Sequence, residues 1–281
     1  MKLLVTGGNG RIGTALVAMA ARRGHDVLSL DSALPVTATR AAKAQVCDVT
    51  EMGEVMELMM NFRPDAVVHM AAWRNAGIVA DHRTYADNVC GSYNVLSAAA
   101  AAGAQRAVFG SSAQVYGFEG QGPQVLPVTE DHPIRPLNAY ALSKVAGEAT
   151  AAHVSRTSGT RVASFRIMGA RPAADMPAEA AAMAADMRKE RFLLWTRIDT
   201  RDVAAACIAA VECTGLEPGP YNIAGAATLA AEPTRDLIAA HCPSLDPGLA
   251  PAGNASPMSC EKARRVFGFD PTLAHVQEAV S

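Results

Sequence analysis

The feature that most constrains this chain is a glycine-rich turn between a short apolar segment and an amphipathic one. Residues 2–6 have the apolar character of a buried strand, and residues 11–23 carry apolar side chains at helical spacing. Between them, Gly7, Gly10 and Gly13 give the spacing G-x-x-G-x-x-G. A strand, a glycine turn and a helix in this order begin a βαβ unit, so the sequence predicts a parallel sheet.

The alternation of strand and helix patterns continues through the first 166 residues. Strands are predicted at 2–6, 26–30, 45–47, 65–70, 106–110 and 161–166, and helices at 11–23, 52–62, 85–102 and 138–158. Parallel strands need right-handed crossovers, so we expect an α/β fold with a doubly wound parallel Rossmann sheet.

After residue 166 the pattern loosens. Helices are predicted at 178–189, 200–211, 233–240, 259–267 and 273–280, with a short strand at 221–223. We expect residues 1–166 to form the dinucleotide-binding domain, with 199–225 returning to it. Residues 167–198 and 226–281 would form a small C-terminal lobe over the carboxyl edge of the sheet, where open α/β folds bind ligands.

Composition excludes several classes of protein. The 281 residues are 50% hydrophobic and carry a net charge of −2, with 5% aromatic residues. A nucleic-acid binder needs a basic surplus, and a membrane span needs a longer apolar run than residues 203–211. Lys2 leads directly into an apolar strand, so we expect no signal peptide. The six cysteines form no C-x-x-C pair, which favours free thiols in a cytoplasmic protein.

Each glycine of the turn has a separate role in binding a dinucleotide. Gly7 permits a tight turn, Gly10 lets a pyrophosphate approach the backbone, and Gly13 lets the helix pack closely. The helix amino terminus offers unpaired N–H groups and the positive end of its dipole. The alternative is a turn that only connects two elements. Arg11 is either a pyrophosphate contact or a solvated residue of the first turn.

Asp31 ends the second predicted strand, close to the offset expected for the acid that binds the adenosine ribose. A carboxylate there accepts hydrogen bonds from both ribose hydroxyls and repels a 2′-phosphate. No arginine follows within the next few residues, so the sequence favours NAD over NADP. The alternative for Asp31 is a turn or helix cap.

Tyr140 and Lys144 lie four residues apart and share one face of a predicted helix. A phenol has a pKa near 10, about three units too high for a base at neutral pH. A nearby ammonium favours the phenolate and lowers that pKa. Ser111 and Ser112 end the fifth predicted strand, where a hydroxyl could orient the substrate oxygen. We expect no metal site, because the seven histidines are not spaced as metal ligands.

The chain resembles the extended short-chain dehydrogenase/reductase family, in its NAD-dependent epimerase/dehydratase branch, over nearly its whole length. The resemblance rests on Thr6-Gly7-Gly8-Asn9-Gly10-Arg11-Ile12-Gly13, Asp48-Val49, Val68-His69-Met70-Ala71-Ala72, Asn88, Ser111-Ser112-Ala113-Gln114-Val115-Tyr116-Gly117, the segment 138–148, Arg201-Asp202-Val203-Ala204, Tyr221-Asn222-Ile223 and the segment 262–269.

The resemblance implies roles for residues at matching positions. Ser112, Tyr140 and Lys144 would be catalytic. The NAD-binding residues would be Gly7, Asn9, Gly10, Arg11, Ile12, Gly13, Asp31, Asp48, Val49, Met70, Ala71, Ala72, Asn88, Tyr140 and Lys144. We interpret His69 as a core histidine, Asn88 as a residue that fixes nearby backbone, and Glu148 as paired locally on the helix surface. Family members often form homodimers through two long helices, so residues 85–102 and 138–158 would form the interface.

The chain departs from nucleotide-sugar epimerases after the sixth strand. Those enzymes carry Arg-x-x-Asn, whereas Arg166 here is followed by glycine at 169, and the stretch to Arg201 is short. The layout is closer to uronate dehydrogenase-like members. Candidate substrate residues are Trp73, Ser111, Ala113, Arg171 and Arg191. Trp73 either walls the site or packs under the lobe. The arginines of this stretch, which include Arg188 and Arg197, either bind a carboxylate or are solvated.

The sequence therefore predicts an NAD-dependent enzyme that acts on a hydroxyl or carbonyl of a sugar or sugar acid. A UDP-sugar 4-epimerase uses the same groups and is the first alternative. Dehydration is disfavoured, because Ala113 and Gln114 stand where dehydratases carry an additional acid. The second alternative is a non-catalytic dinucleotide sensor, although such proteins typically lose the Tyr–Lys pair.

Overall fold

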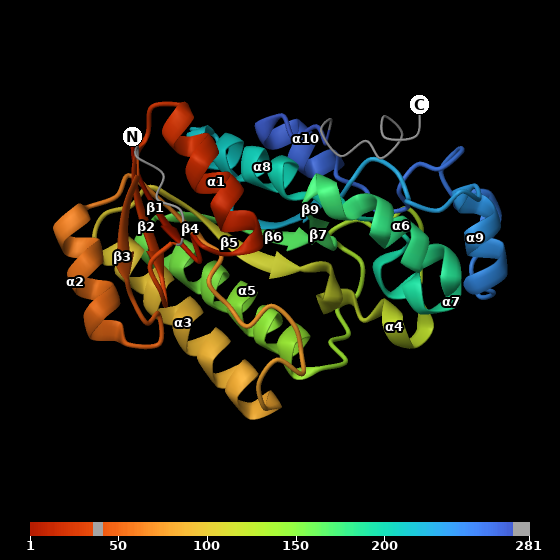
Figure 1. Cartoon of the computed structure of the whole chain (residues 1–281), viewed down its shortest axis with the longest axis horizontal. Coiled ribbons are helices and arrows are strands. Elements are labelled where there is room, and N and C mark those ends of the chain that lie inside the picture. The colour runs from red at the N-terminus through yellow and green to blue at the C-terminus, as the bar shows by residue number, and fades with distance from the viewer. Residues whose placement is uncertain (36–41, 272–281) are drawn as a thin grey trace.

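A parallel sheet forms the centre of the molecule (Figure 1). The computed structural model describes residues 1–35 and 42–271, and in these ranges seven strands form the sheet in the order β3-β2-β1-β4-β5-β6-β9. The strands are β1 (Lys2–Thr6), β2 (Asp26–Asp31), β3 (Ala42–Val46), β4 (Ala66–His69), β5 (Arg106–Ser112), β6 (Arg161–Ile167) and β9 (Gly219–Ile223). The order reverses between β1 and β4, which is the position where such sheets bind ligands. The predicted doubly wound fold is confirmed.

Helices cover both faces of the sheet. One face carries α1 (Arg11–Arg22), α8 (Thr200–Glu212) and α10 (Glu261–Phe267), and the other carries α2 (Met52–Phe62), α3 (Asp81–Ala101) and α5 (Ala139–Ser158). Successive strand residues point to opposite faces. Leu3 and Val5 accordingly join the core under α1 and α8, while Leu4 joins the core under α2 and α3.

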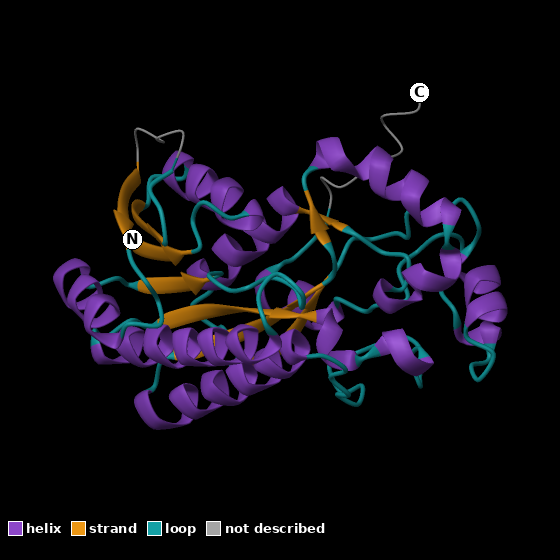
Figure 2. Cartoon of the chain, turned by 60° about the horizontal axis from the view of Figure 1, so that its bottom comes forward, coloured by secondary structure: helices purple, strands orange, loops and turns teal. Residues whose placement is uncertain are grey.

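The two long helices α3 and α5 lie side by side across the sheet (Figure 2). Gly147 brings α5 against β5, because a Cβ there would lie 2.2 Å from the Phe109 ring. Asn138 caps α5, with its side-chain oxygen accepting a hydrogen bond of 2.8 Å from the Ala141 amide. The start of α5 is therefore fixed near the carboxyl end of β5.

A smaller lobe lies beyond the carboxyl ends of the strands. Its elements are η1 (Ala113–Tyr116), α4 (Phe118–Gln121), β7 (Ala170–Arg171), η2 (Ala173–Asp175), α6 (Met176–Ala185), α7 (Met187–Glu190), η3 (Arg191–Leu193), β8 (Ile198–Asp199), α9 (Thr234–His241) and η4 (Pro247–Leu249). A separate core that includes Trp195, Met168 and Ile238 holds them together. Trp195 is fully buried, and its indole N–H donates to the Met187 carbonyl at 2.8 Å.

Two elements differ from the sequence prediction. The helix expected at 178–189 is broken at Asp186, which has φ −151° and accepts a hydrogen bond from the Lys189 amide as the cap of α7. The helix expected in the lobe near residue 260 is α10, which instead packs against α8 and β9. Phe267 at its end stacks on Phe165 of β6. The helix predicted at 273–280 lies outside the described residues.

In the described part of the chain, no helix combines the length and apolar character that a membrane crossing requires. All six cysteines fall within the described ranges and are free thiols.

Candidate active site

The glycine turn lies at the switch point between β1 and β4. Gly7 has φ +71°, which favours glycine, and a Cβ there would lie 2.6 Å from the Ala71 amide nitrogen. A Cβ on Gly13 would lie 2.0 Å from the Gly7 carbonyl oxygen. A Cβ on Gly10 would meet only that same oxygen, at 3.0 Å. Gly7 and Gly13 therefore hold the turn together, while Gly10 presents bare backbone to the outside.

Asp31 ends β2 beside this turn. Its Oδ2 accepts a hydrogen bond of 2.9 Å from the Asn9 amide, and its Oδ1 accepts one of 2.8 Å from the Ser32 amide. The Asn9 side chain in turn donates to the Ala33 carbonyl. The carboxylate thus orders the glycine turn.

The other residues expected around the cofactor lie near the same edge. Met70, Ala71 and Ala72 follow β4, and the Met70 amide donates to the Thr6 carbonyl at 3.1 Å. Asp48 follows β3 and accepts hydrogen bonds from Thr50. The remaining two are Val49, which packs against Gly91 of α3, and Ile12, which packs into the core under α1.

Arg11 begins α1 and reaches the lobe, where its Nη1 donates to the Ala170 carbonyl at 3.2 Å. Partial burial lowers its pKa, and the nearby charges of Arg171 and Arg74 lower it further. Three positive side chains therefore gather at the start of α1, close to the turn that offers unpaired N–H groups to an anion.

Ser112, Tyr140 and Lys144 come together at the ends of β5 and α5. Each is buried, with 7%, 7% and 5% of its surface exposed. The Lys144 ammonium lies 5.6 Å from the centre of the Tyr140 ring and 5.2 Å from that of Phe109. The Ser112 side chain lies close enough to the Tyr140 phenol to lower its pKa.

Burial dominates the pKa values in this cluster. It raises the pKa of Tyr140 to about 12, against the opposing effect of Ser112. It lowers the pKa of Lys144 to about 8, and no carboxylate among the described residues pairs with this ammonium. The expectation that Lys144 and a bound nicotinamide together lower the phenol pKa concerns the loaded site, whereas in the protein alone desolvation of the phenolate dominates.

Asn88 connects the segment after β4 to the start of α5. Its amide group donates to the Trp73 carbonyl at 3.1 Å and to the Ser143 hydroxyl at 3.0 Å, and accepts from the Trp73 amide at 2.8 Å. Ser143 in turn donates to the Tyr140 carbonyl. Asn88 therefore fixes backbone around Tyr140, in agreement with its interpretation from the sequence.

His69 is a core residue, as expected. It is 2% exposed, and its Nδ1 lies 2.7 Å from the Thr6 hydroxyl oxygen. Burial lowers its pKa to about 3, with a further contribution from Lys144, so the ring is neutral at physiological pH.

The expected substrate residues are dispersed. The Trp73 indole donates to Asp87 of α3 at 2.8 Å, so Trp73 is held against that helix and does not pack under the lobe. Ala113 is fully buried, and Ser111 donates to Glu148 at 2.6 Å. Ser111 and Ala113 are thus placed away from a substrate surface. The Arg191 guanidinium donates to the carbonyls of Glu119, Gly120 and His241, so it staples loops of the lobe together.

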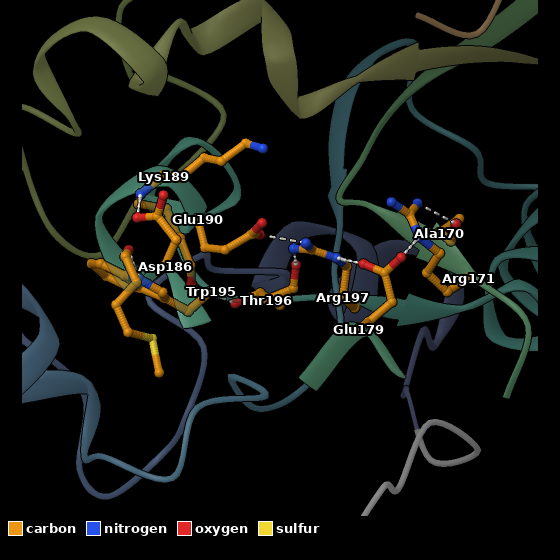
Figure 3. A network of polar contacts seen from close by, with 11 residues as sticks. Ala170, Arg171, Glu179, Asp186, Lys189, Glu190, Trp195, Thr196 and Arg197 are labelled. Carbon is orange, nitrogen blue, oxygen red and sulfur yellow. Dashed lines mark hydrogen bonds and ion pairs between the residues drawn. The ribbon is translucent and has the colours of Figure 1, made fainter. Parts of the chain in front are cut away.

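The arginines around β7 and β8 are paired rather than solvated (Figure 3). Arg197 is 4% exposed and donates to Glu179 at 2.8 Å and to Glu190. Arg171 pairs with the same Glu179. This network joins α6 and α7 to the paired strands β7 and β8, and leaves Arg171 engaged within the lobe.

A cavity of about 900 Å³ lies between the segments that follow β4 and β5, the start of α5 and the lobe. Gln114 and Asn138, two residues from Ser112 and Tyr140 respectively, line it together with Asn75. Asn138 donates to the Gln114 side chain, which donates to Asn75. The opposite wall carries Asp186, Arg188, Lys189, Arg191 and Phe192. The cavity therefore offers amides and cations to a polar ligand.

Sequence reasoning missed the position of Glu148, which we expected on the helix surface. Its side chain is 12% exposed and forms a bidentate pair with Arg166 of β6. Tyr140, Lys144 and Glu148 are spaced four residues apart on α5, so the signal for a shared buried face was present in the sequence.

A family model described as the NAD dependent epimerase/dehydratase family matches residues 3–224. The UDP-glucose 4-epimerase of Corynebacterium glutamicum is 36% identical over 154 residues, which are 52% of this chain and 44% of that protein. The UDP-glucose 4-epimerase of Lactobacillus helveticus is 34% identical over 172 residues, with 59% and 51% coverage. The match thus spans about half the length of these relatives.

Solved structures share the fold. The Thermotoga maritima UDP-glucose 4-epimerase with UDP-glucose aligns with TM-score 0.75 at 20% identity, covering 97% of this chain and 94% of that one. A short-chain dehydrogenase/reductase superfamily protein from Agrobacterium tumefaciens with bound NAD aligns with TM-score 0.74 at 24% identity, with 96% and 92% coverage. A mutated uronate dehydrogenase aligns with TM-score 0.65 at 23% identity, with 82% and 76% coverage.

Proposed function

The chain belongs to the NAD-dependent epimerase/dehydratase family, and we propose that it oxidises or reduces a sugar or sugar acid at a hydroxyl or carbonyl group through Ser112, Tyr140 and Lys144. The observation that carries the proposal is the buried cluster of Ser112, Tyr140 and Lys144, in which the Lys144 ammonium lies 5.6 Å from the centre of the phenol ring. A buried ammonium without a carboxylate partner is costly, and such groups concentrate at functional sites.

The residues around the glycine turn fit NAD. The backbone at Gly10 is open, Asp31 beside it would bind the ribose, and Arg11 at the start of α1 would face the diphosphate. NAD supplies the hydride acceptor when bound, and its positive ring lowers the pKa of a neighbouring phenol.

The chain's own groups divide the remaining work. The Ser112 hydroxyl orients the substrate oxygen, and Tyr140 exchanges the proton with it. Lys144 favours the phenolate electrostatically. Burial raises the pKa of Tyr140 to about 12, so the phenol of the cofactor-free protein is protonated at neutral pH.

The cavity supports a polar, hydroxylated substrate with a negative group. Asn75, Gln114 and Asn138 supply hydrogen bonds to hydroxyl groups, while Arg188 and Lys189 supply positive charge. A free sugar acid meets this description and fits the glycine at 169, where nucleotide-sugar epimerases carry asparagine. A UDP-sugar 4-epimerase is the second candidate, which the names of the curated relatives favour.

A substrate panel with excess NAD tests the proposal. Stoichiometric NADH from a hexuronate supports a dehydrogenase, and interconversion of UDP-hexoses without net NADH supports an epimerase. If the protein turns over no hexuronate, no UDP-hexose and no neutral hexose, catalysis on sugars is refuted. Tyr140→Phe should lower kcat by about 10²–10⁴-fold, the range of acid–base catalysis, while NAD affinity measured by calorimetry stays within threefold. A cellular phenotype that Tyr140→Phe leaves unchanged and Asp31→Ala abolishes would favour a dinucleotide sensor.

We also propose that α3 and α5 form a homodimer interface. Their outer faces expose large apolar side chains, with Tyr85, Tyr93 and Leu142 at 38%, 51% and 47% exposure. Alanine-rich stretches in both helices allow a second pair of helices to approach closely. Light scattering should give twice the chain mass for the wild type and a monomer for Tyr93→Arg. A monomeric wild type would refute the dimer.

A further inference from the structure

Three polar side chains lie in one row across the strands next to the catalytic cluster. In the sheet register Ser111 of β5 is the partner of Arg166 of β6, and Arg166 is the partner of Asn222 of β9. Register partners in a parallel sheet point to the same face. A polar row inside a sheet is unusual because every group in it must be paired.

Glu148 of α5 closes this row from above the sheet. Its Oε1 accepts hydrogen bonds from the Ser111 hydroxyl at 2.6 Å and from Arg166 Nε at 3.0 Å. Its Oε2 accepts from Arg166 Nη2 at 2.8 Å. The Arg166 side chain is 3% exposed and that of Glu148 is 12% exposed, so the pair is largely buried. A bidentate pair of this kind fixes orientation as well as distance.

The other side of Arg166 reaches the lobe. Its Nη1 donates to the Tyr116 hydroxyl at 2.9 Å and to the Glu130 carbonyl at 2.8 Å. Tyr116 donates onward to the Asn222 side chain at 2.6 Å. The Asn222 backbone N–H in turn donates to the Glu130 carboxylate at 2.8 Å. One guanidinium therefore connects the catalytic helix, two strands and a loop of the lobe.

This network holds both halves of the catalytic pair. Glu148 follows Tyr140 and Lys144 at intervals of four residues, so fixing Glu148 fixes the rotation of the face that carries them. Ser111 immediately precedes Ser112, so its bond to Glu148 ties the end of β5 to the same helix.

We propose that the Glu148–Arg166 pair, with Ser111, is a positioning clamp that keeps the Tyr140 phenol in register with the Ser112 hydroxyl. The effect of the clamp on turnover rests on the proposed function, because the position of the phenol relative to Ser112 matters only if these groups are catalytic. Glu148 is a positioning residue and does not touch the reacting atoms.

Two variants test the clamp. Glu148→Gln removes the charge but keeps the size of the side chain, and Ser111→Ala cuts the link to β5 without leaving a buried charge. Asp199→Asn is the matched control, because Asp199 is a fully buried carboxylate that accepts two hydrogen bonds from the Arg201 guanidinium and caps α8. All are compared as full-length protein at a temperature well below unfolding.

Hydrogen exchange of the cofactor-free protein gives a readout independent of activity. Glu148→Gln should speed exchange of amides in residues 139–150 by about tenfold, because the local opening of α5 becomes easier, whereas Asp199→Asn should leave them unchanged. With the substrate identified by the panel, both test variants should lose kcat, by about 100-fold for Glu148→Gln and less for Ser111→Ala, with KM changed less than threefold. Arg166→Lys, which keeps the charge but loses the bidentate geometry, should not restore kcat.

The outcomes separate the clamp from the proposed function. Unchanged exchange in 139–150, or a kcat for Glu148→Gln equal to that of Asp199→Asn, would overturn the clamp and leave a purely structural ion pair. Faster exchange in α5 together with a wild type inactive on the whole panel would refute the proposed function but retain the role of the clamp in fixing α5.

Discussion

Alanine substitutions at Gly13 and Gly10 should separate folding from cofactor binding. At Gly13 the added Cβ would lie 2.0 Å from the Gly7 carbonyl oxygen and 2.7 Å from the Gly8 Cα. Both contacts are backbone, so neither can move aside as a flexible side chain would. Overpacking lowers the free energy of unfolding by about 1–3 kcal/mol, and we expect Gly13→Ala to lose about 3 kcal/mol. For a chain of this size that corresponds to a midpoint roughly 6–12 °C lower.

At Gly10 the added Cβ would meet only the Gly7 oxygen, at 3.0 Å, and the backbone angles of φ −71° and ψ 171° suit any residue. The loss of stability should stay below about 1 kcal/mol. The methyl group would instead occupy the surface that a diphosphate approaches. NAD affinity should fall by roughly 30-fold, or about 2 kcal/mol.

Thermal unfolding without cofactor and calorimetric titration with NAD measure the two effects on the same samples. The reasoning is refuted if Gly10→Ala unfolds as early as Gly13→Ala, or if Gly10→Ala binds NAD as tightly as the wild type does. The first result would mean that the backbone at Gly10 does not accommodate a methyl group, and the second would mean that the open backbone there has no part in binding.

Three further substitutions test other parts of the site. Asp31→Ala should weaken NAD binding by roughly tenfold and narrow the preference over NADP, as measured by KM for each cofactor. Lys144→Met should abolish turnover yet stabilise the cofactor-free protein by about 3 kcal/mol at neutral pH, because burial lowers the pKa of Lys144 from 10.5 to about 8. The unfolded chain binds that proton more strongly, so wild-type stability should rise between pH 8 and 10.5 and the gap between the two proteins should close, as followed by urea unfolding. Arg197→Met should cost about 3–5 kcal/mol in the same assay, because Glu179 and Glu190 lose a shared buried partner; a loss below 1 kcal/mol would contradict this.

Local patterns were sufficient for the sheet and the cofactor side of the site. Strand and helix periods are properties of short segments, and the roles of Gly7 and Gly13 follow from the geometry of a turn between two such segments. The pairing of Tyr140 with Lys144 is also local, since both lie on one helix. These features needed no knowledge of distant contacts.

The remaining features depend on contacts between distant segments. Glu148 was expected on the surface because its partner Arg166 lies on another element, and composition alone does not reveal that a charged pair is buried. The pKa of Tyr140 in the protein alone could not be predicted for a related reason. The distance to an ammonium can be inferred from helical spacing, but the degree of desolvation depends on everything packed around the phenol. The predicted helix is also split at Asp186, because the Asp186 side chain accepts a hydrogen bond from the Lys189 amide and starts a new helix there.

Several arginines of this protein donate hydrogen bonds to main-chain oxygens, either alone or in addition to side-chain partners. Arg166 holds the Glu130 carbonyl, and Arg191 holds the carbonyls of Glu119 and Gly120. A hydrogen bond to a carbonyl oxygen depends on the backbone conformation of the loop and not on the side chain of the residue that accepts it. Residues in the loops beside the cavity can therefore be substituted while the hydrogen bonds to their carbonyl groups remain. Single substitutions there can change which substrate binds without displacing the loops.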